Sequence, residues 1–168
     1  MRFDLNRLLD GAGVSEVVTD DVDLSRYSAG GEAPFQTPVQ LTAQARNRAG
    51  VVTLDCVYRY TLALRCDRCL APVSREITLT VPHTVVRSLQ NTEEDDEYLV
   101  APDGLVELSE VAANDVIPEL PSRTLCREDC KGLCPSCGCD RNTTQCRCEE
   151  KETDPRLAAL DKFFDEGE

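Results

Sequence analysis

Seven cysteines lie in one short segment of the chain, CREDCKGLCPSCGCDRNTTQCRC, which runs from Cys126 to Cys148. This density of thiols argues against the interpretation that the cysteines are merely small buried hydrophobic residues. The N-terminus is charged from Arg2 onward and has no long apolar run, so we expect neither a signal peptide nor a transmembrane helix. We therefore expect a cytoplasmic protein, and in a reducing compartment metal binding explains clustered cysteines better than disulfide bonds do.

The spacing of these cysteines predicts a tetrahedral metal site. In the pentad CPSCG two thiolates three residues apart can bind one metal, and Gly138 gives the turn its conformational freedom. Three arrangements stay open: one zinc bound by this pair and the downstream thiols, one zinc at the upstream pair, or two metals that share bridging thiolates. Cys139 is expected to point away from the site. The candidate ligands are Cys126, Cys130, Cys134, Cys137, Cys146 and Cys148.

Zinc is the preferred metal, because closed four-cysteine sites are its usual structural sites. An iron–sulfur cluster, a disulfide and free thiols are the alternatives. A catalytic zinc needs an open position and usually a nearby base, and the cysteine-rich segment has no histidine. His83 lies in an expected strand and is interpreted as a packed or exposed residue. The sequence shows no Ser–His–Asp or Cys–His pairing and no phosphate-binding loop, so we expect no enzyme and no small-molecule substrate.

A second CxxC, formed by Cys66, Asp67, Arg68 and Cys69, lies at an expected hairpin tip. A thioredoxin-like motif needs a βαβ setting and a helix N-terminus, and both are missing from a strand–turn–strand context. We favour a structural or interaction role for these four residues. Participation in a metal site is the second interpretation, since any such metal would need thiols from elsewhere. Cys56, on the apolar face of a strand, is interpreted as a core residue.

Apolar and polar residues alternate from about Pro38 to Arg87, which is the period of a β-strand. Turn residues separate three such stretches: Asn47 and Gly50 first, then the CDRCLAP segment. The fold class is therefore predicted as α+β, an antiparallel β-meander or small barrel-like sheet covered by a helix, with a C-terminal Cys-rich zinc-binding appendage. The apolar stripes are Val39, Leu41, Ala43 and Ala45; Val52, Leu54, Cys56, Tyr58, Tyr60, Leu62 and Leu64; and Ile77, Leu79, Val81 and Val85.

The covering helix is expected in LSEVAANDVIPEL, capped at or near Ser109 and kinked or ended near Ile117 by Pro118. Residues 4–9 predict a short helical turn, and DPRLAALDKFF predicts a short amphipathic helix near the C-terminus. The predicted organisation has three parts. Residues 1–37 form a helical or irregular N-terminal segment, residues 38–122 hold the meander, an acidic loop and the covering helix, and residues 123–168 hold the zinc knuckle and the last helix.

The chain is strongly acidic, with a formal net charge of −13. Ten carboxylates and no basic residue lie between Ser88 and Ser122, and the run EEDDE within this stretch is expected to be a solvated loop. Such a chain is repelled by phosphate backbones but attracts basic proteins. The alternative interpretation is that the charge only keeps the protein soluble.

Five stretches together resemble the YceD family, the domain-of-unknown-function 177 proteins. They are LALRCDRCLAPVSREI (62–77), an acidic middle, ELSEVAANDVIPELP (107–121), LCREDCKGLCPSCG (125–138) and DPRLAAL (154–160), in an order and spacing that match from about residue 40 to 160. The resemblance implies a role in the accumulation of large-subunit ribosomal RNA. The family gene commonly neighbours that of a small basic protein of the same subunit, which in many bacteria is a zinc-ribbon protein.

Some members of the family lack the C-terminal cysteines and keep the central CxxC. The resemblance therefore implies that the C-terminal thiols stabilise the structure, and it draws attention to Cys66, Asp67, Arg68 and Cys69. Pro118 departs from the unbroken helix that the family leads us to expect.

Three functions follow as hypotheses. The first is a non-enzymatic factor whose acidic body binds a basic ribosomal protein of the large subunit or a pre-ribosomal particle, with ribosomal RNA contacted indirectly and no membrane involved. The second is a zinc-knuckle module that contacts large-subunit RNA directly. The third is a thiol–disulfide or metal-hydrolase enzyme, supported only by the CxxC motif. The basic residues that would contact RNA in the second hypothesis are Arg127, Lys131, Arg141, Arg147 and Lys151.

Overall fold

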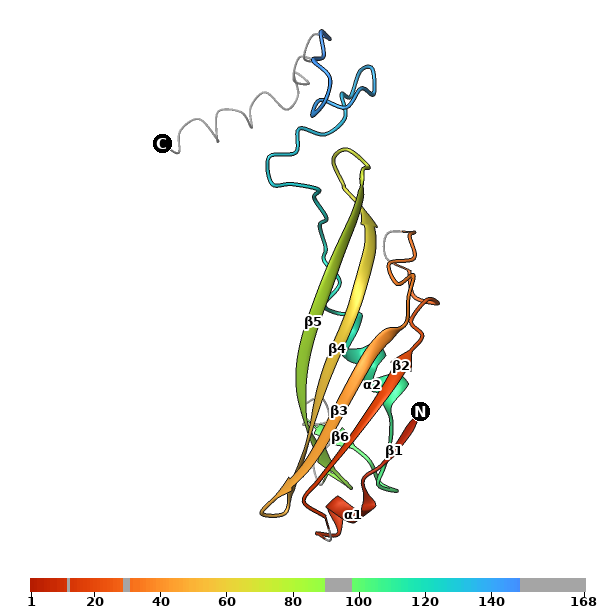
Figure 1. Ribbon diagram of the computed structural model, residues 1–168, viewed down its shortest axis with the longest axis vertical. Helices are drawn as coiled ribbons and strands as arrows, with labels where there is room; N and C mark the ends of the chain where they lie inside the picture. The colour runs from red at the N-terminus through yellow and green to blue at the C-terminus, as the bar shows by residue number, and fades with distance from the viewer. Residues whose placement is uncertain (12, 29–30, 90–97, 149–168) are drawn as a thin grey trace, which may run out of the picture.

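A computed structural model describes residues 1–11, 13–28, 31–89 and 98–148 (Figure 1). Its main element is a five-stranded sheet in the order β2-β3-β4-β5-β6. The first four strands pair antiparallel, and β6 joins β5 in parallel. The strands are β2 (Ser15–Val22), β3 (Val39–Arg48), β4 (Val51–Arg65), β5 (Pro72–Val86) and β6 (Tyr98–Val100). The antiparallel meander predicted between residues 38 and 87 is confirmed as β3, β4 and β5.

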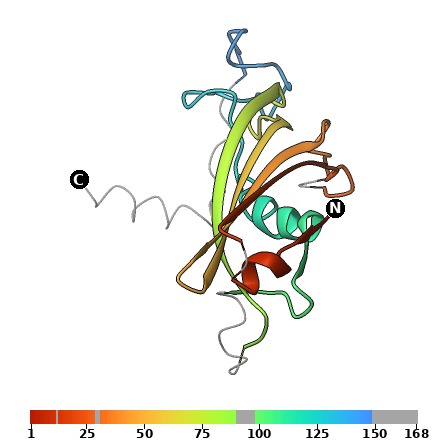
Figure 2. The same ribbon diagram turned by 60° about the horizontal axis from the view of Figure 1, so that its bottom comes forward.

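The remaining elements lie on one side of this sheet. Strand β1 (Arg2–Asp4) pairs with β7 (Leu105–Glu107), and α1 (Asn6–Leu9) follows β1 directly. Figure 2 shows α2 (Leu108–Val116) against the face around which the twisted sheet curves. No helix in the described ranges has the length and apolar character needed to cross a membrane.

Two hairpins of different length build the meander. The first turns through Ala49 and Gly50, whose φ angles of 53° and 89° are those of a two-residue type I′ turn. The second joins two strands of 15 residues each. Strand β3 pairs with β4 only as far as Arg59, whereas β5 pairs with β4 as far as Arg65. The β4–β5 hairpin therefore extends past the rest of the sheet, and its tip reaches the cysteine-rich segment (Figure 1).

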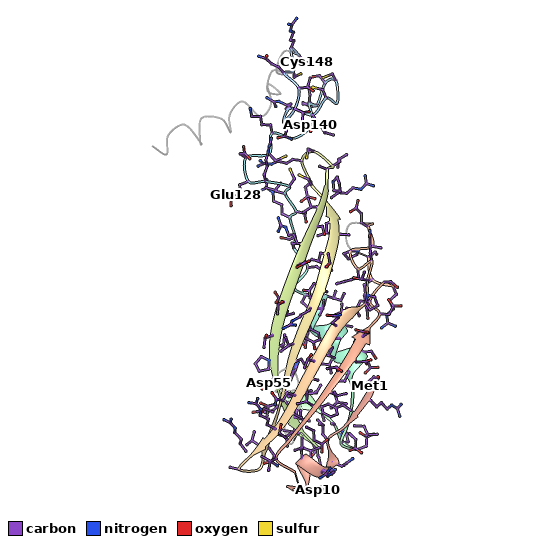
Figure 3. The ribbon with its side chains drawn as sticks, viewed as in Figure 1. Met1, Asp10, Asp55, Glu128, Asp140 and Cys148 are labelled. Atoms are coloured by element: carbon purple, nitrogen blue, oxygen red, sulfur yellow. The ribbon has the colours of Figure 1, made fainter. Side chains whose placement is uncertain are left out.

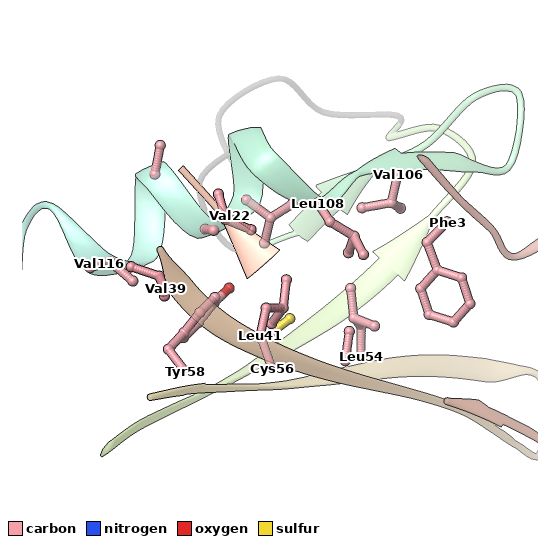
Figure 4. Packing of buried hydrophobic residues seen from close by; sticks show 14 of the residues in the cluster. Phe3, Val22, Val39, Leu41, Leu54, Cys56, Tyr58, Val106, Leu108 and Val116 are labelled. Carbon is pink, nitrogen blue, oxygen red and sulfur yellow. The ribbon is translucent and has the colours of Figure 1, made fainter. Parts of the chain in front are cut away.

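The core lies between the inner face of the sheet and α2. In Figure 4 the side chains of Leu41, Leu54 and Tyr58 point from β3 and β4 toward Leu108 and Val116 of α2. The alternation of buried and exposed residues along β3 and β4 follows the predicted period of two. Cys56 is completely buried in this layer, which confirms its interpretation as a core residue.

The N-terminal region contains more strand than the sequence indicated. Residues 1–37 were expected to be helical or irregular, and the helical turn expected at residues 4–9 is present as α1. Strand β2, however, extends the sheet beyond the predicted meander. The inner stripe of β2 contains Glu16 and Asp20 beside Val18 and Val22, and these carboxylates obscure the apolar alternation.

The ends of α2 agree with the role expected of Pro118, since the helix stops at Val116 with Ile117 as its C-cap. The N-cap is Glu107, two residues before the expected Ser109, and it makes no side-chain capping hydrogen bond. The Ser109 hydroxyl donates to Glu107 Oε1 at 3.1 Å. The EEDDE run and the predicted C-terminal helix lie outside the described residues.

Candidate metal centres

The structure gathers most of the thiols into two separate groups of four. Within each group all sulfur atoms lie within 4.8 Å of one another. Figure 3 shows this cysteine-rich segment, with Glu128, Asp140 and Cys148, beyond the hairpin tip and at the opposite end of the molecule from Asp10. The groups are Cys66, Cys69, Cys126 and Cys130, and Cys134, Cys137, Cys139 and Cys146.

The first group joins the β4–β5 hairpin tip to the C-terminal segment. The sulfur atoms of Cys66 and Cys130 are 3.8 Å apart, and those of Cys69 and Cys126 are 3.6 Å apart. Four sulfurs at about 2.3 Å from a tetrahedral zinc are separated by about 3.8 Å, which agrees with these distances. A metal here would be bound by two pairs of ligands that are far apart in the sequence.

Three of the four thiols in this first group are enclosed by protein. Cys66, Cys69 and Cys130 are buried and pack against apolar side chains, whereas Cys126 is exposed. Four protein ligands would fill the coordination sphere of a tetrahedral metal, an arrangement typical of structural zinc sites. The apolar neighbours are Ala71, Val73, Leu125 and Leu133.

The hairpin turn aims backbone N–H groups at the thiols. The turn is closed by hydrogen bonds from Cys66 N to Ala71 O and from Leu70 N to Cys66 O, both of 2.8 Å, with Leu70 in the left-handed region at φ 61°. Burial raises the pKa of the Cys66 thiol, but N–H groups of Cys126, Cys69 and Arg68 outweigh it and bring that pKa down to about 6. Thiolates are the form that binds metal.

Asp67 and Arg68 attach the C-terminal segment to the hairpin. The Asp67 carboxylate accepts the Thr124 N–H at 2.6 Å, and the Asp67 N–H donates to Thr124 O at 2.8 Å. The Arg68 guanidinium donates to Cys130 O at 2.7 Å, and the backbone carbonyl of Arg68 accepts the Leu133 N–H at 2.9 Å. The two residues between the CxxC thiols therefore bring Cys126 and Cys130 to the hairpin tip.

Two further contacts strengthen this attachment. Arg75 of β5 donates to Leu125 O at 3.0 Å. Gly132, at φ 71°, passes so close to Arg68 that a Cβ atom on it would lie 2.9 Å from Arg68 O. No other residue type fits this approach without displacing the backbone.

The second group is formed within the C-terminal segment alone. Cys146 Sγ lies 3.7 Å from Cys137 Sγ and 3.4 Å from Cys134 Sγ. The turn is closed by hydrogen bonds from Cys134 N to Cys139 O at 2.8 Å and from Gly138 N to Cys134 O at 2.9 Å, with Gly138 at φ 73°. N–H groups of Cys137 and Ser136 lower the pKa of Cys134 to about 6. Only Cys134 is buried, so this group is more open than the first.

The grouping differs in part from the arrangements that the sequence suggested. Cys126 and Cys130 lie beside the two CxxC thiols at the hairpin tip. These four thiols form a complete set of ligands without the downstream cysteines. The two groups share no thiol, which argues against bridging. Cys139 lies within the second group, and its expected orientation away from the site is wrong. Cys148 is outside that group of four, although its N–H approaches Cys146 Sγ at 3.4 Å.

A third polar group lies in the core beneath α2. His83 Nε2 is 2.8 Å from Asp115 Oδ2, the Tyr58 hydroxyl donates to the same carboxylate oxygen, and Cys56 is close by. Cys56 is fully buried. Sequence reasoning missed the pairing because His83 and Asp115 lie on different elements, and no local spacing connects them.

Charge is distributed unevenly over the molecule. Residues 122–148 contain five basic and three acidic side chains, although the whole chain has a net charge of −13. A cleft of about 780 Å³ lies beside the second thiol group, and Lys131, Asn142 and Thr144 are among the residues that line it. The cysteine-rich end is therefore less acidic than the rest of the protein.

Several known proteins are similar to this chain. The protein YlbN of Bacillus subtilis (strain 168) is 24% identical over 129 residues, which cover 76% of this chain and 75% of YlbN. The protein Rv2926c of Mycobacterium tuberculosis (strain H37Rv) is 33% identical over 114 residues, 66% of this chain and 54% of the relative. The chain thus spans about half the length of the mycobacterial protein. No solved structure matches it.

Two of the matches, one to a plant protein and one to a protein family, carry a functional description. The maize (Zea mays) protein named "Large ribosomal RNA subunit accumulation protein YCED homolog 1, chloroplastic" is 24% identical over 147 residues, 69% of this chain and 50% of the maize protein. Residues 54–164 match the family described as "Large ribosomal RNA subunit accumulation protein YceD". This match includes both thiol groups and more than half of the chain, and the protein therefore belongs to the YceD family.

Proposed function

We propose that this protein is a non-enzymatic ribosome-biogenesis factor that promotes accumulation of large-subunit ribosomal RNA in the cytoplasm. It would do so by binding a basic ribosomal protein of the large subunit or a pre-ribosomal particle. Family membership supports the link to ribosomal RNA. The single observation that favours a basic partner is the net charge of −13, since opposite charge steers association.

The proposal that no reaction is catalysed rests on the burial of most first-group thiols and of Cys56 in the core. Three thiols of the first group are buried, and Cys56 beside His83 is completely buried. A catalytic nucleophile must be reached by its substrate, whereas these thiols face other protein groups. The first thiol group and the contact between His83 and Asp115 each fit a role in holding two parts of the fold together.

We propose zinc as the metal of both thiol groups, with one ion in each. The sulfur–sulfur separations of 3.4 to 3.8 Å suit tetrahedral zinc, and closed four-cysteine sites are typical of this metal. Bound zinc would supply folding free energy to a segment that has few buried apolar residues of its own. Elemental analysis of protein purified without added metal is expected to find two zinc ions per chain. Iron with visible charge-transfer absorption, or no stoichiometric metal, would contradict this assignment.

A second candidate function is direct contact with large-subunit RNA by the cysteine-rich end. The observation that favours it is the polar cleft beside the second thiol group, where Lys131 lies near side-chain amides and hydroxyls. Such a surface suits phosphate oxygens. The rest of the chain is acidic, so this contact would be confined to that end of the molecule.

Affinity purification of the tagged protein from its own cells, with protein and RNA both identified, tests the two functions. At low salt we expect a basic ribosomal protein or precursor large-subunit particles, with recovery falling as salt rises because the attraction is electrostatic. Digestion of the RNA before capture separates the candidates, since a protein contact persists and an RNA contact is lost. Recovery of neither ribosomal proteins nor particles at low salt would contradict the proposal.

A further inference from the structure

Strand β2 is a free edge of the main sheet along its whole length. It pairs with β3 on one side, and in the described part of the chain no strand pairs with its other side. The opposite margin is formed by β6, which pairs with β5 only from Thr84 to Val86, and by the rest of β5, which carries Pro82 and Arg75. In Figure 1 β2 runs along the outer margin of the sheet. An edge of this length is long enough to accept a further strand.

The register shows which residues of β2 face outward. Asn47 N donates to Val14 O at 3.1 Å, so even-numbered residues of this strand direct their backbone groups at β3. The odd-numbered residues therefore direct theirs away from the sheet. Within the described residues the N–H groups of Ser15, Val17 and Thr19 have no hydrogen-bond partner. The Asp21 N–H is taken by the side chain of Asp20 at 3.0 Å.

The protection of this edge against strand addition is negative charge alone, which a basic partner neutralises. Natural edge strands are often short or carry lysine, proline or a bulge. Strand β2, SEVVTDDV, has no lysine and no proline. It also exposes apolar surface, since Val17 is 59% exposed. An apolar residue of the added strand opposite Val17 would cover part of this side chain.

The charge along β2 selects the kind of strand that can be added. No basic residue lies between Arg7 and Arg26, whereas Glu16, Asp20 and Asp21 lie on the strand. Arg7 approaches Glu16 at 3.7 Å and the N-terminal amine approaches Asp20 at 3.5 Å, and such exposed pairs bind weakly. A second copy of this chain would place carboxylates beside carboxylates, which is unfavourable. A lysine- and arginine-rich segment would pair opposite charges instead.

We propose that the free edge of β2 binds an extended, Lys/Arg-rich segment of a partner protein, which joins the sheet as an additional strand. This inference rests on the proposed function and adds the chemistry of the partner. Backbone pairing from Ser15 to Asp21 uses about seven partner residues, some 24 Å of extended chain. Basic residues four apart on one face of the added strand would lie opposite Glu16 and Asp20.

A peptide titration followed by NMR tests the pairing directly. The probe is the capped heptapeptide Lys-Arg-Thr-Val-Val-Lys-Thr, written to pair antiparallel from Asp21 to Ser15. We expect its binding to slow hydrogen exchange at the amides of Ser15, Val17 and Thr19, and to leave Glu16 and Val18 nearly unchanged because their amides are already bonded. No change at the odd-numbered amides, or changes confined to the cysteine-rich segment, would overturn the inference.

Two isomers of the probe separate backbone pairing from charge attraction. N-methylation of the third and fifth residues removes N–H groups that would face β2, and we expect binding about tenfold weaker from two lost hydrogen bonds. N-methylation of the fourth and sixth residues removes N–H groups that face away, and binding should persist. Equal binding of the two isomers would show that only charge is recognised and would overturn strand addition.

A substitution in β2 tests whether the same edge binds the partner in cells. Thr19→Pro removes an outward N–H and leaves the pairing with β3 in place, because proline is tolerated at a free edge. Thr19→Val keeps the N–H and serves as the matched control. We expect the proline variant to recover less basic ribosomal protein or particle than the control in the low-salt purification. Equal recovery by both variants would overturn the role of β2 and leave the proposed function standing, whereas no recovery by the wild type would overturn both.

Discussion

His83 and Asp115 join β5 to α2 through a contact of 2.8 Å between Nε2 and Oδ2. The two side chains are 19% and 8% exposed, so solvent screens this pair only in part. The hydrogen bond to Asp115, assisted by Cys56, raises the pKa of His83 to about 9. An ion pair thereby connects the helix to the centre of the sheet.

This raised pKa predicts a pH dependence of stability. Because the folded-state pKa of His83, about 9, lies above its ordinary value of 6.5, the stabilisation is fully present below pH 6.5 and is lost as pH rises through 9. Its size should be on the order of 1–3 kcal/mol. Urea denaturation between pH 6 and 10 is the measurement, with His83→Gln as the comparison. The stability difference between wild type and variant should shrink with rising pH, and a constant difference would contradict the assignment.

Two tyrosines of β4 provide a matched pair of substitutions. The Tyr58 hydroxyl donates to Asp115, whereas the buried Tyr60 hydroxyl has no partner among the described residues. Tyr58→Phe should therefore lower the free energy of unfolding by about 1–3 kcal/mol, because it leaves the largely buried Asp115 carboxylate with one donor fewer. Tyr60→Phe removes no hydrogen bond and should be neutral or stabilising. Equal losses in the two variants, measured by urea denaturation at pH 7, would contradict this account.

The meander could be predicted from sequence because its signal is local. Residues on β3 and β4 alternate with a period of two, and Asn47 and Gly50 mark the turn between them. Strand β2 escaped prediction because Glu16 and Asp20 face the same side as Val18 and Val22. Pairing with β3 decides the structure of this segment, and that pairing is not visible in its own pattern.

The first thiol group could be predicted only in part. The Cys66–Cys69 pair was recognised as needing thiols from elsewhere, but its partners lie 57 and 64 residues away along the chain. The hydrogen bonds of Asp67 and Arg68 to the C-terminal segment determine which cysteines meet. Side-chain contacts of this kind have no sequence period. The same reason hid the contact between His83 and Asp115.

Two glycines with similar backbone angles should respond differently to substitution. Gly132→Ala places a Cβ atom 2.9 Å from Arg68 O at φ 71°, whereas at Gly138, with φ 73°, no atom lies within 4 Å of the added Cβ. Gly138→Ala should thus show only the backbone penalty of about 1 kcal/mol. Gly132→Ala adds a clash at the hairpin attachment and should speed release of metal to a chelator, followed with a colorimetric zinc indicator. Faster release from Gly138→Ala than from Gly132→Ala would contradict this difference.

Loss of the first thiol group should detach the C-terminal segment from the hairpin. Cys66→Ser removes a buried ligand from a group that unites two distant parts of the chain, and elemental analysis should find one zinc per chain in place of two. Thr124, held by Asp67 in the wild type, should then become mobile, so trypsin should cleave faster after Arg123. Cys137→Ser is the matched control, since it removes a ligand of the second group and leaves the hairpin attachment intact. It should also retain one zinc, but the cleavage rate after Arg123 should equal that of the wild type. Equal acceleration in both variants would mean that the two groups support the attachment together, contrary to the separation seen in the structure.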